Sequence, residues 1–162
     1  MGETKATQKE VRDEWERKLA LSAPSRELLE ELALACAKED SPLATFQYAF
    51  ALSKSSQASE LRYAVSILDG LVKDGYEHQV DCMYGSATAL YLLGDHKEAR
   101  ARCEAILRTQ PSARFAKELH LASIEAEEDK KREQLKTAAL GSVGAAAAIG
   151  VVAGIASLLL KK

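Results

Sequence analysis

Apolar residues recur at the helical spacing of three and four positions throughout the chain between Glu10 and Lys136, and no run alternates apolar and polar side chains as a strand would. Residues that favour turns interrupt this pattern at six places. The breaks fall at Ala23-Pro24-Ser25, Asp40-Ser41-Pro42, Lys54 to Ser59, Asp74-Gly75, Gly94-Asp95 and Gln110-Pro111-Ser112. The pattern therefore predicts an all-α domain of short helices joined by tight turns, with Ser25 as an N-cap.

The segment from Asp81 to Pro111 has the residue order and spacing of a tetratricopeptide repeat, a hairpin of two helices. Each position has a mechanical reason. The small residues Ala87 and Ala99 let the two helices approach closely, and Gly94 makes the turn between them. Pro111 stops the second helix because proline has no backbone N–H to continue it.

A second copy of the repeat lies upstream. Ala64, Leu68 and Leu71 precede Ala99, Cys103 and Ile106 by 35 positions, and Tyr48 and Ala51 precede Tyr84 and Ala87 by 36. Two repeats cannot bury their faces alone, so we expect a capping helix at each end. Residues 25–39 supply one cap, with Leu28, Leu32 and Cys36 on one stripe. The other cap begins near Ser112 and carries Phe115, Leu119 and Ala122.

The stretch from Thr137 to Leu160 has no charged residue over 24 positions, which is about 36 Å as a helix against about 30 Å for a hydrocarbon core. A buried core helix is the weaker alternative, since few are uncharged on every face. We therefore predict three parts: an N-terminal arm over 1–24, a tetratricopeptide-like helical domain over 25–136, and one C-terminal transmembrane helix, a tail anchor, over 137–162.

The charges that flank the span predict its orientation. Lys130, Lys131, Arg132 and Lys136 come before it and outnumber Lys161 and Lys162 after it, which places the N-terminal domain in the cytosol by the positive-inside rule. The first twenty residues also lack the apolar stretch of a signal peptide. Within the span, the small residues Ala146, Gly150 and Gly154 recur every four positions. They form either a face for homo-oligomer contacts or a chance pattern in a segment rich in small residues.

Composition narrows the possible functions. Lys and Arg number 22 against 24 Asp and Glu, so no strong field attracts nucleic acid. The cysteines Cys36, Cys82 and Cys103 are far apart among apolar residues, as reduced core side chains are. The histidines His78, His96 and His120 lie in separate contexts, with no partner at ligand spacing. We expect no catalytic residues, no metal and no cofactor, and therefore a protein that binds other proteins.

Tandem helix hairpins form a concave groove from the first helix of each pair, and we expect partners to bind there. Aromatic rings can anchor a partner at little entropic cost. The alternative for each tyrosine is that it fills the core between repeats. The predicted groove residues are Asp81, Tyr84, Thr88, Tyr91 and Leu92 in the second repeat and Thr45, Tyr48 and Leu52 in the first.

The N-terminal arm carries one narrow apolar stripe, because Val11, Trp15 and Leu19 recur at every fourth position among charged residues. So narrow a stripe on a short helix needs a surface to lie on. Two hypotheses follow. The arm is either a removable, autoinhibitory lid over the groove or a helix packed permanently on an outer face.

The ordered combination of two degenerate repeats, capping helices and a Gly/Ala-rich tail closed by lysines resembles the mitochondrial fission 1 protein family. The stretches that carry the likeness are FQYAFALSKS, LRYAVSILDGLV, ALYLLGDHKEARARCEAILRTQP, AKEL and the tail from Gly141 onward. The resemblance implies an adaptor of the mitochondrial outer membrane, and also of the peroxisomal membrane. It implies recruitment of a dynamin-related GTPase, directly or through other adaptors, and a groove that includes Tyr91.

Two features depart from the family pattern: the longer, charged segment 1–24, and Gly85 and Ser86 in place of bulkier residues. Both put the identity of the partner in doubt more than the role of scaffold. Two other classes therefore stay open. One is a tail-anchored chaperone-docking receptor, although such grooves rely on several Lys and Arg. The other is a structural subunit of a membrane complex with its groove permanently filled.

Overall fold

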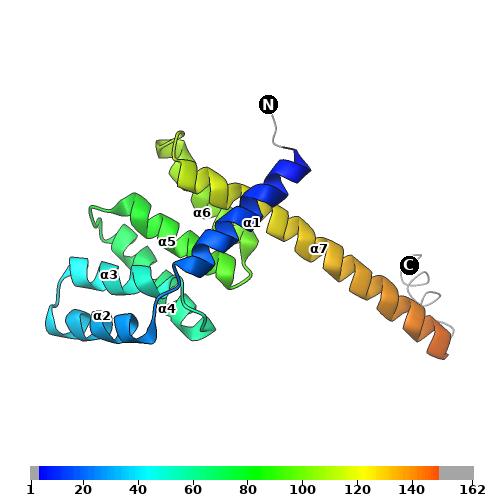
Figure 1. Cartoon of the computed structure of the whole chain (residues 1–162), viewed down its shortest axis with the longest axis horizontal. Coiled ribbons are helices and arrows are strands. Elements are labelled where there is room, and N and C mark those ends of the chain that lie inside the picture. The colour runs from blue at the N-terminus through cyan, green and yellow to red at the C-terminus, as the bar shows by residue number, and fades with distance from the viewer. Residues whose placement is uncertain (1–3, 150–162) are drawn as a thin grey trace. The chain divides into compact units, whose positions relative to one another are not determined.

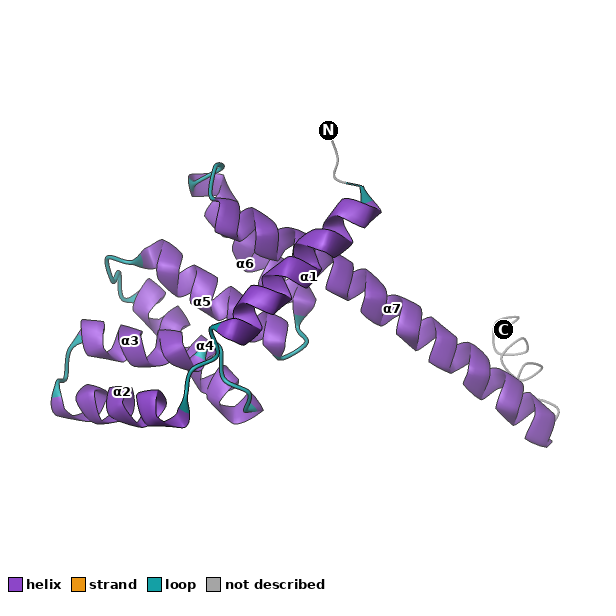
Figure 2. Cartoon of the chain, in the orientation of Figure 1, coloured by secondary structure: helices purple, strands orange, loops and turns teal. Residues whose placement is uncertain are grey.

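The computed structural model describes residues 4–149, and the side chains of residues 4–141. Within residues 4–149 all regular structure is helical, in seven helices (Figures 1 and 2). The all-α class predicted from the sequence is therefore confirmed. The helices are α1 (Lys5–Leu21), α2 (Arg26–Lys38), α3 (Pro42–Leu52), α4 (Ala58–Lys73), α5 (Gln79–Leu92), α6 (His96–Thr109) and α7 (Arg114–Ile149).

The helix ends coincide with the six predicted breaks, and their chemistry explains why. Ser25 caps α2, since its hydroxyl oxygen accepts the backbone N–H of Leu28 at 3.1 Å, and Ser41 and Asp95 cap α3 and α6 in the same way. The turns after α4 and α5 have Gly75 and Gly94 at φ of 79° and 85°. Glycine adopts this left-handed conformation without the steric cost that a Cβ atom brings.

The helices α3 with α4, and α5 with α6, form the two predicted hairpins, and α5 packs against both α3 and α4. Small residues lie where these helices approach: Ala64, Ala87 and Ala99 are fully buried. A methyl side chain in each place lets neighbouring backbones come close enough to exclude water. The two repeats therefore share one continuous core.

Helix α2 caps the first hairpin, but its buried side is one position away from the predicted stripe. Leu29 is 3% exposed and packs with Leu52 and Ala64, whereas Leu28 is 42% exposed. Adjacent leucines give two stripes that fit the helical period equally well, so periodicity could not separate them. The surface of α3 decides which one is buried.

The first turns of α7 cap the second hairpin as predicted. Leu119 and Ala122 are fully buried in the cluster that also holds Cys103. Phe115 lies at the edge of this cap, where its ring meets Tyr84 edge-on at a centroid distance of 5.0 Å. Residues up to Ala126 form one compact unit, and α7 from Glu127 onward belongs to a second.

The predicted membrane span, Thr137 to Leu160, follows the first compact unit in the sequence. Gly150 and Gly154 fall outside the described residues, and Ala146 lies in α7 without a described side chain. Among residues 4–149, none of the helices has both the length and the apolar character that a membrane crossing requires. The tail anchor and its small-residue face stay predictions from the sequence.

Candidate partner-binding groove

Helix α1 lies across α5 (Figure 1) and is fastened to it by Trp15. Its first turn is capped by Thr4, and its exposed side carries ion pairs such as Lys9 with Asp13 at 3.0 Å. Trp15 is 5% exposed, and its ring meets that of Tyr91 edge-on at a centroid distance of 4.8 Å. Its indole Nε1–H donates a hydrogen bond to the Tyr84 hydroxyl at 3.0 Å. One side chain thus engages both tyrosines of the predicted groove.

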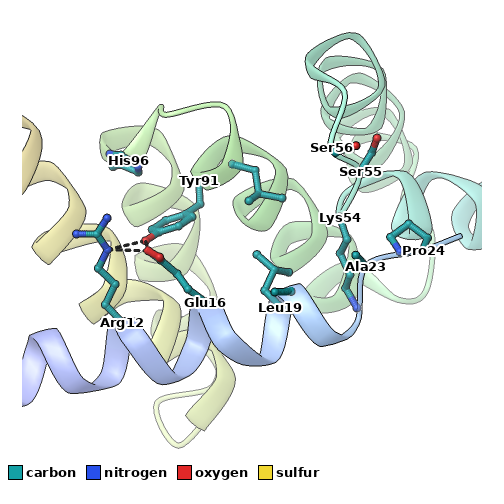
Figure 3. A pocket seen from close by; sticks show the side chains of 12 residues that line it. Arg12, Glu16, Leu19, Ala23, Pro24, Lys54, Ser55, Ser56, Tyr91 and His96 are labelled. Atoms are coloured by element: carbon teal, nitrogen blue, oxygen red, sulfur yellow. Dashed lines mark hydrogen bonds and ion pairs between the residues drawn. The ribbon is translucent and has the colours of Figure 1, made fainter.

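A polar latch, formed by Arg12, Glu16 and Tyr91, also joins α1 to α5 (Figure 3). The Tyr91 hydroxyl donates to Glu16 Oε1 at 2.6 Å and accepts from Arg12 Nε at 3.0 Å, while Arg12 and Glu16 pair at 2.7 Å. Burial raises the pKa of Tyr91, and the hydrogen bond to Glu16 raises it further. The phenol therefore stays neutral and keeps the proton that it donates to Glu16.

Three hollows surround this contact. The α1 pocket, of about 460 Å³, lies between α1, the end of α5 and the turn after α3 (Figure 3). The inner pocket, of about 260 Å³, is lined by Trp15, Tyr84, Thr88 and Glu118. The open groove, of about 750 Å³, runs between α2 and α3 and is walled at one end by the linker from Ser22 to Ser25. Lys54 lines all three hollows.

The structure brings together most of the groove residues predicted in the second repeat. Tyr84 and Thr88 line the inner pocket, and Tyr91 and Leu92 line the α1 pocket. Asp81, by contrast, is exposed in the first turn of α5 and lines none of the three hollows. The arm residue Leu19 lines both pockets on the α1 side, whereas Val11 is half-buried and lines neither.

The residues predicted in the first repeat lie on another side of α3. Leu52 is 1% exposed and packs with Leu29, so it belongs to the core and is not a groove residue. Tyr48 meets Tyr63 edge-on at 6.4 Å, and Thr45 lies 3.7 Å from the Cys36 sulfur. These three residues were predicted to line the groove because they correspond, by the repeat spacing, to residues of α5. In the structure, α2 packs on that side of α3.

The side of α3 that does line the open groove was not predicted from the sequence. Phe46 and Phe50 form one wall and Leu28 and Leu32 of α2 form the other. A signal was present, because Phe46, Phe50 and Lys54 are spaced four apart and therefore share a helix face.

Gly85 and Ser86, which replace bulkier residues of the family pattern, serve packing. A Cβ atom on Gly85 would lie 2.7 Å from Leu68 Cδ1, so only glycine fits without a shift of its neighbours. Ser86 is fully buried and donates a hydrogen bond to Asp69 at 2.9 Å, and Asp69 also pairs with Arg102 at 2.5 Å. This network joins α4, α5 and α6 on a side away from the tyrosines.

The cysteines have the character of core residues. Burial raises the pKa of Cys82 to about 11 and that of Cys103 to about 12, so both thiols stay protonated and weakly nucleophilic at neutral pH. Among residues 4–149, no three His, Cys, Asp or Glu side chains gather closely enough to hold a metal ion. The hollows around α1 are the candidate site that the structure offers.

No family model matches the chain. Among curated proteins, it is 29% identical to the mitochondrial fission 1 protein of Debaryomyces hansenii over 88% of this chain and 89% of the relative. It is 31% identical to the mitochondrial fission 1 protein of Neurospora crassa over 68% of this chain and 69% of the relative.

Two solved structures share the fold. The fission protein Fis1 from Saccharomyces cerevisiae superimposes with a TM-score of 0.61 at 22% identity, covering 74% of this chain and 95% of that one. Yeast Fis1 in complex with an Mdv1 fragment containing N-terminal extension and coiled coil domains gives a TM-score of 0.59 at 21% identity, covering 68% and 88%.

Proposed function

Because the chain belongs to the mitochondrial fission 1 protein family, we propose that it is a membrane-anchored adaptor that recruits organelle-division machinery. Proteins of this family are non-enzymatic adaptors. The machinery would be a dynamin-related GTPase, bound directly or through other adaptors. In support, a structural neighbour of the same fold is yeast Fis1 in complex with a fragment of Mdv1.

The place of action would be the mitochondrial outer membrane, with a share on peroxisomes, and the helical domain would face the cytosol. Membership of the mitochondrial fission 1 protein family supports a location at mitochondria. The uncharged stretch from Thr137 to Leu160 supports attachment through the tail, since its length matches a bilayer core. The small residues Ala146, Gly150 and Gly154 would then allow two anchors to pack together.

One observation carries the proposal at the site: Trp15 covers Tyr84 and Tyr91, the aromatic residues best suited to hold a partner. We propose that α1 is a removable lid and that a partner takes the place of Trp15. Trp15 is the single buried residue of α1, and Val11 and Leu19 are only half-buried. Full burial of one large apolar side chain contributes about 1.5 to 3 kcal/mol, and ordering the arm offsets part of it. The hydrogen bonds to Tyr84 and Tyr91 add about 0.5 to 1.5 kcal/mol each, because water takes their place when the lid opens. A lid held by one buried side chain and a few such bonds can open when a partner replaces these contacts.

Trp15 is the only tryptophan in the chain, so its fluorescence reports the lid alone. The experiment adds a tryptophan-free version of the yeast Mdv1 fragment to the full chain in lipid nanodiscs. We expect the Trp15 emission to shift to the red and acrylamide quenching to accelerate as the fragment binds. Binding itself is followed independently by the anisotropy of a dye on the fragment.

A second protein for the same experiment is the variant Tyr91→Phe, which removes the hydroxyl of the polar latch and keeps the ring. We expect this variant to show faster quenching before any fragment is added, and to bind the fragment more tightly. A blue, protected Trp15 at saturating fragment would reject the lid. Absence of fragment binding by both proteins would count against the adaptor role itself.

A further inference from the structure

We propose that the open groove between α2 and α3 takes a partner helix with two apolar residues and one carboxylate in register, and that Lys54 receives the carboxylate. The inference rests on the proposed adaptor role, since it names the chemistry of a segment that such an adaptor binds. It concerns a surface beside α1, distinct from the tyrosines that Trp15 covers.

Most of the charged side chains that line the three hollows have a partner of opposite charge. Glu16 pairs with Arg12, Lys18 with Glu14 at 3.9 Å, and Glu118 with Arg114 at 2.9 Å. Lys54 is different, because among the described residues no carboxylate lies within ion-pair distance of its ammonium group.

The ammonium group of Lys54 lies 5.4 Å from the centroid of the Phe50 ring. Lys54 as a whole residue is half-buried, so its side chain lies against the protein surface. A cation held against an aromatic face, and lacking an anion, is prepared to bind one.

The shape of the open groove adds the apolar part of the ligand. Phe46 and Phe50 are one turn apart on α3, and Leu28 and Leu32 are one turn apart on α2. Two such ridges with a hollow of about 750 Å³ between them match the apolar stripe of an amphipathic helix. Lys54 is the only charged side chain that lines this groove within the described part of the chain.

The spacing along α3 sets the pattern of the partner. Phe46, Phe50 and Lys54 follow each other at four-residue intervals, so the wall reads apolar, apolar, cationic from one turn to the next. A helix lying along this wall places its own residues at the same rise. It should therefore carry two apolar residues four apart and an Asp or Glu four positions beyond one of them.

The sequence of the partner helix is found by selection from a library. A yeast-displayed library of 14-residue helical segments, randomised on one face, is sorted against the full chain in lipid nanodiscs. Parallel sorts use Lys54→Glu and, as a matched control, Lys73→Glu, which makes the same charge change at an exposed position at the end of α4. Circular dichroism verifies that each variant keeps the helix content of the parent protein.

We expect the parent protein and Lys73→Glu to enrich two apolar residues four apart with an acid four positions before or after the pair. We expect Lys54→Glu to enrich Lys or Arg at that position instead. For the best peptide, changing its acid to the amide should weaken binding to the parent protein about tenfold, and should leave binding to Lys54→Met unchanged.

Three outcomes would overturn the inference: no enriched helix, enrichment without an acid, or an acid preference that survives in Lys54→Glu. The lid is tested separately, because Trp15 emission should stay constant when a peptide fills the open groove. The library pattern, together with a Trp15 that stays blue and protected when the Mdv1 fragment binds, would reject the lid and keep the acidic helix. A lid that opens for the Mdv1 fragment without the library pattern would do the reverse.

Discussion

At the level of single residues, the contacts separate what spacing can predict from what it cannot. Ala64, Ala87 and Ala99 were predicted as close-contact positions because a helix hairpin needs small side chains at fixed intervals, and all three are buried. Tyr48 was predicted in the groove by its repeat relation to Tyr84, and it packs elsewhere. Spacing fixes the position of a residue within its repeat. Which neighbouring helix covers that residue depends on how the helices pack, and the repeat spacing carries no information about packing.

Gly85 gives a residue-scale prediction about packing. In Gly85→Ala the new Cβ atom would lie 2.7 Å from Leu68 Cδ1 and 3.1 Å from the Phe50 ring, so both must shift. We expect the free energy of unfolding to fall by about 1 to 3 kcal/mol, the usual cost of overpacking a core. Urea denaturation followed by circular dichroism measures the change.

The matched control for this prediction is Gly70→Ala in α4. A Cβ atom at Gly70 would meet nothing within 4 Å apart from its chain neighbours and the nearby backbone of its own helix. Alanine also favours the helix, so stability should rise by about 0.5 to 1 kcal/mol. Equal effects of the two substitutions would mean that Gly85 is not a contact position, and the account of the α3, α4 and α5 core would need revision.

At the level of whole helices, the elements differ widely in how firmly they are held. Eight residues of α5 are buried against its neighbours, while α1 has Trp15 alone. The sequence predicted that both segments are helical and predicted the breaks that follow them, because turn residues are local signals. It did not predict that α1 begins at Lys5, since the apolar stripe starts only at Val11. It left open whether α1 covers the groove or an outer face, since a stripe of Val11, Trp15 and Leu19 shows that a surface is needed without showing which one.

This contrast predicts an order of hydrogen exchange. We expect the backbone amides of α1 to exchange at least tenfold faster than those of α5 in the full chain, because opening α1 exposes few apolar contacts. Mass spectrometry of peptic fragments gives both rates in one experiment. The variant Trp15→Ala should accelerate exchange in α1 and leave α5 nearly unchanged. Equal protection of α1 and α5 would show that α1 is a permanent part of the core, which is the alternative to a lid.

At the level of the whole molecule, the four buried clusters of described residues all lie between Trp15 and Ala126. The repeats and their caps could be predicted because each supplies a surface that the next one buries. The open groove could not be predicted from the sequence, since its position depends on which side of α3 is covered by α2. From Glu127 onward, α7 carries ion pairs within its own length, such as Lys131 with Glu127 at 3.5 Å and Lys136 with Glu133 at 3.4 Å.

The last prediction follows from this division. A chain that ends at Lys136 keeps every buried cluster of the described residues, together with the ion pairs that support the helix after Ala126. It loses the uncharged stretch from Thr137 to Leu160. We expect it to fold with a melting temperature like that of the helical domain in the full chain, to sediment as a monomer, and to disperse through the cytosol when expressed in cells. Circular dichroism, analytical ultracentrifugation and cell fractionation measure these three properties. The full chain is the control, and it should be recovered in the mitochondrial membrane fraction. If the shortened chain still sedimented with membranes, a second membrane contact would have to lie within residues 1–136, and the tail would not be the sole anchor.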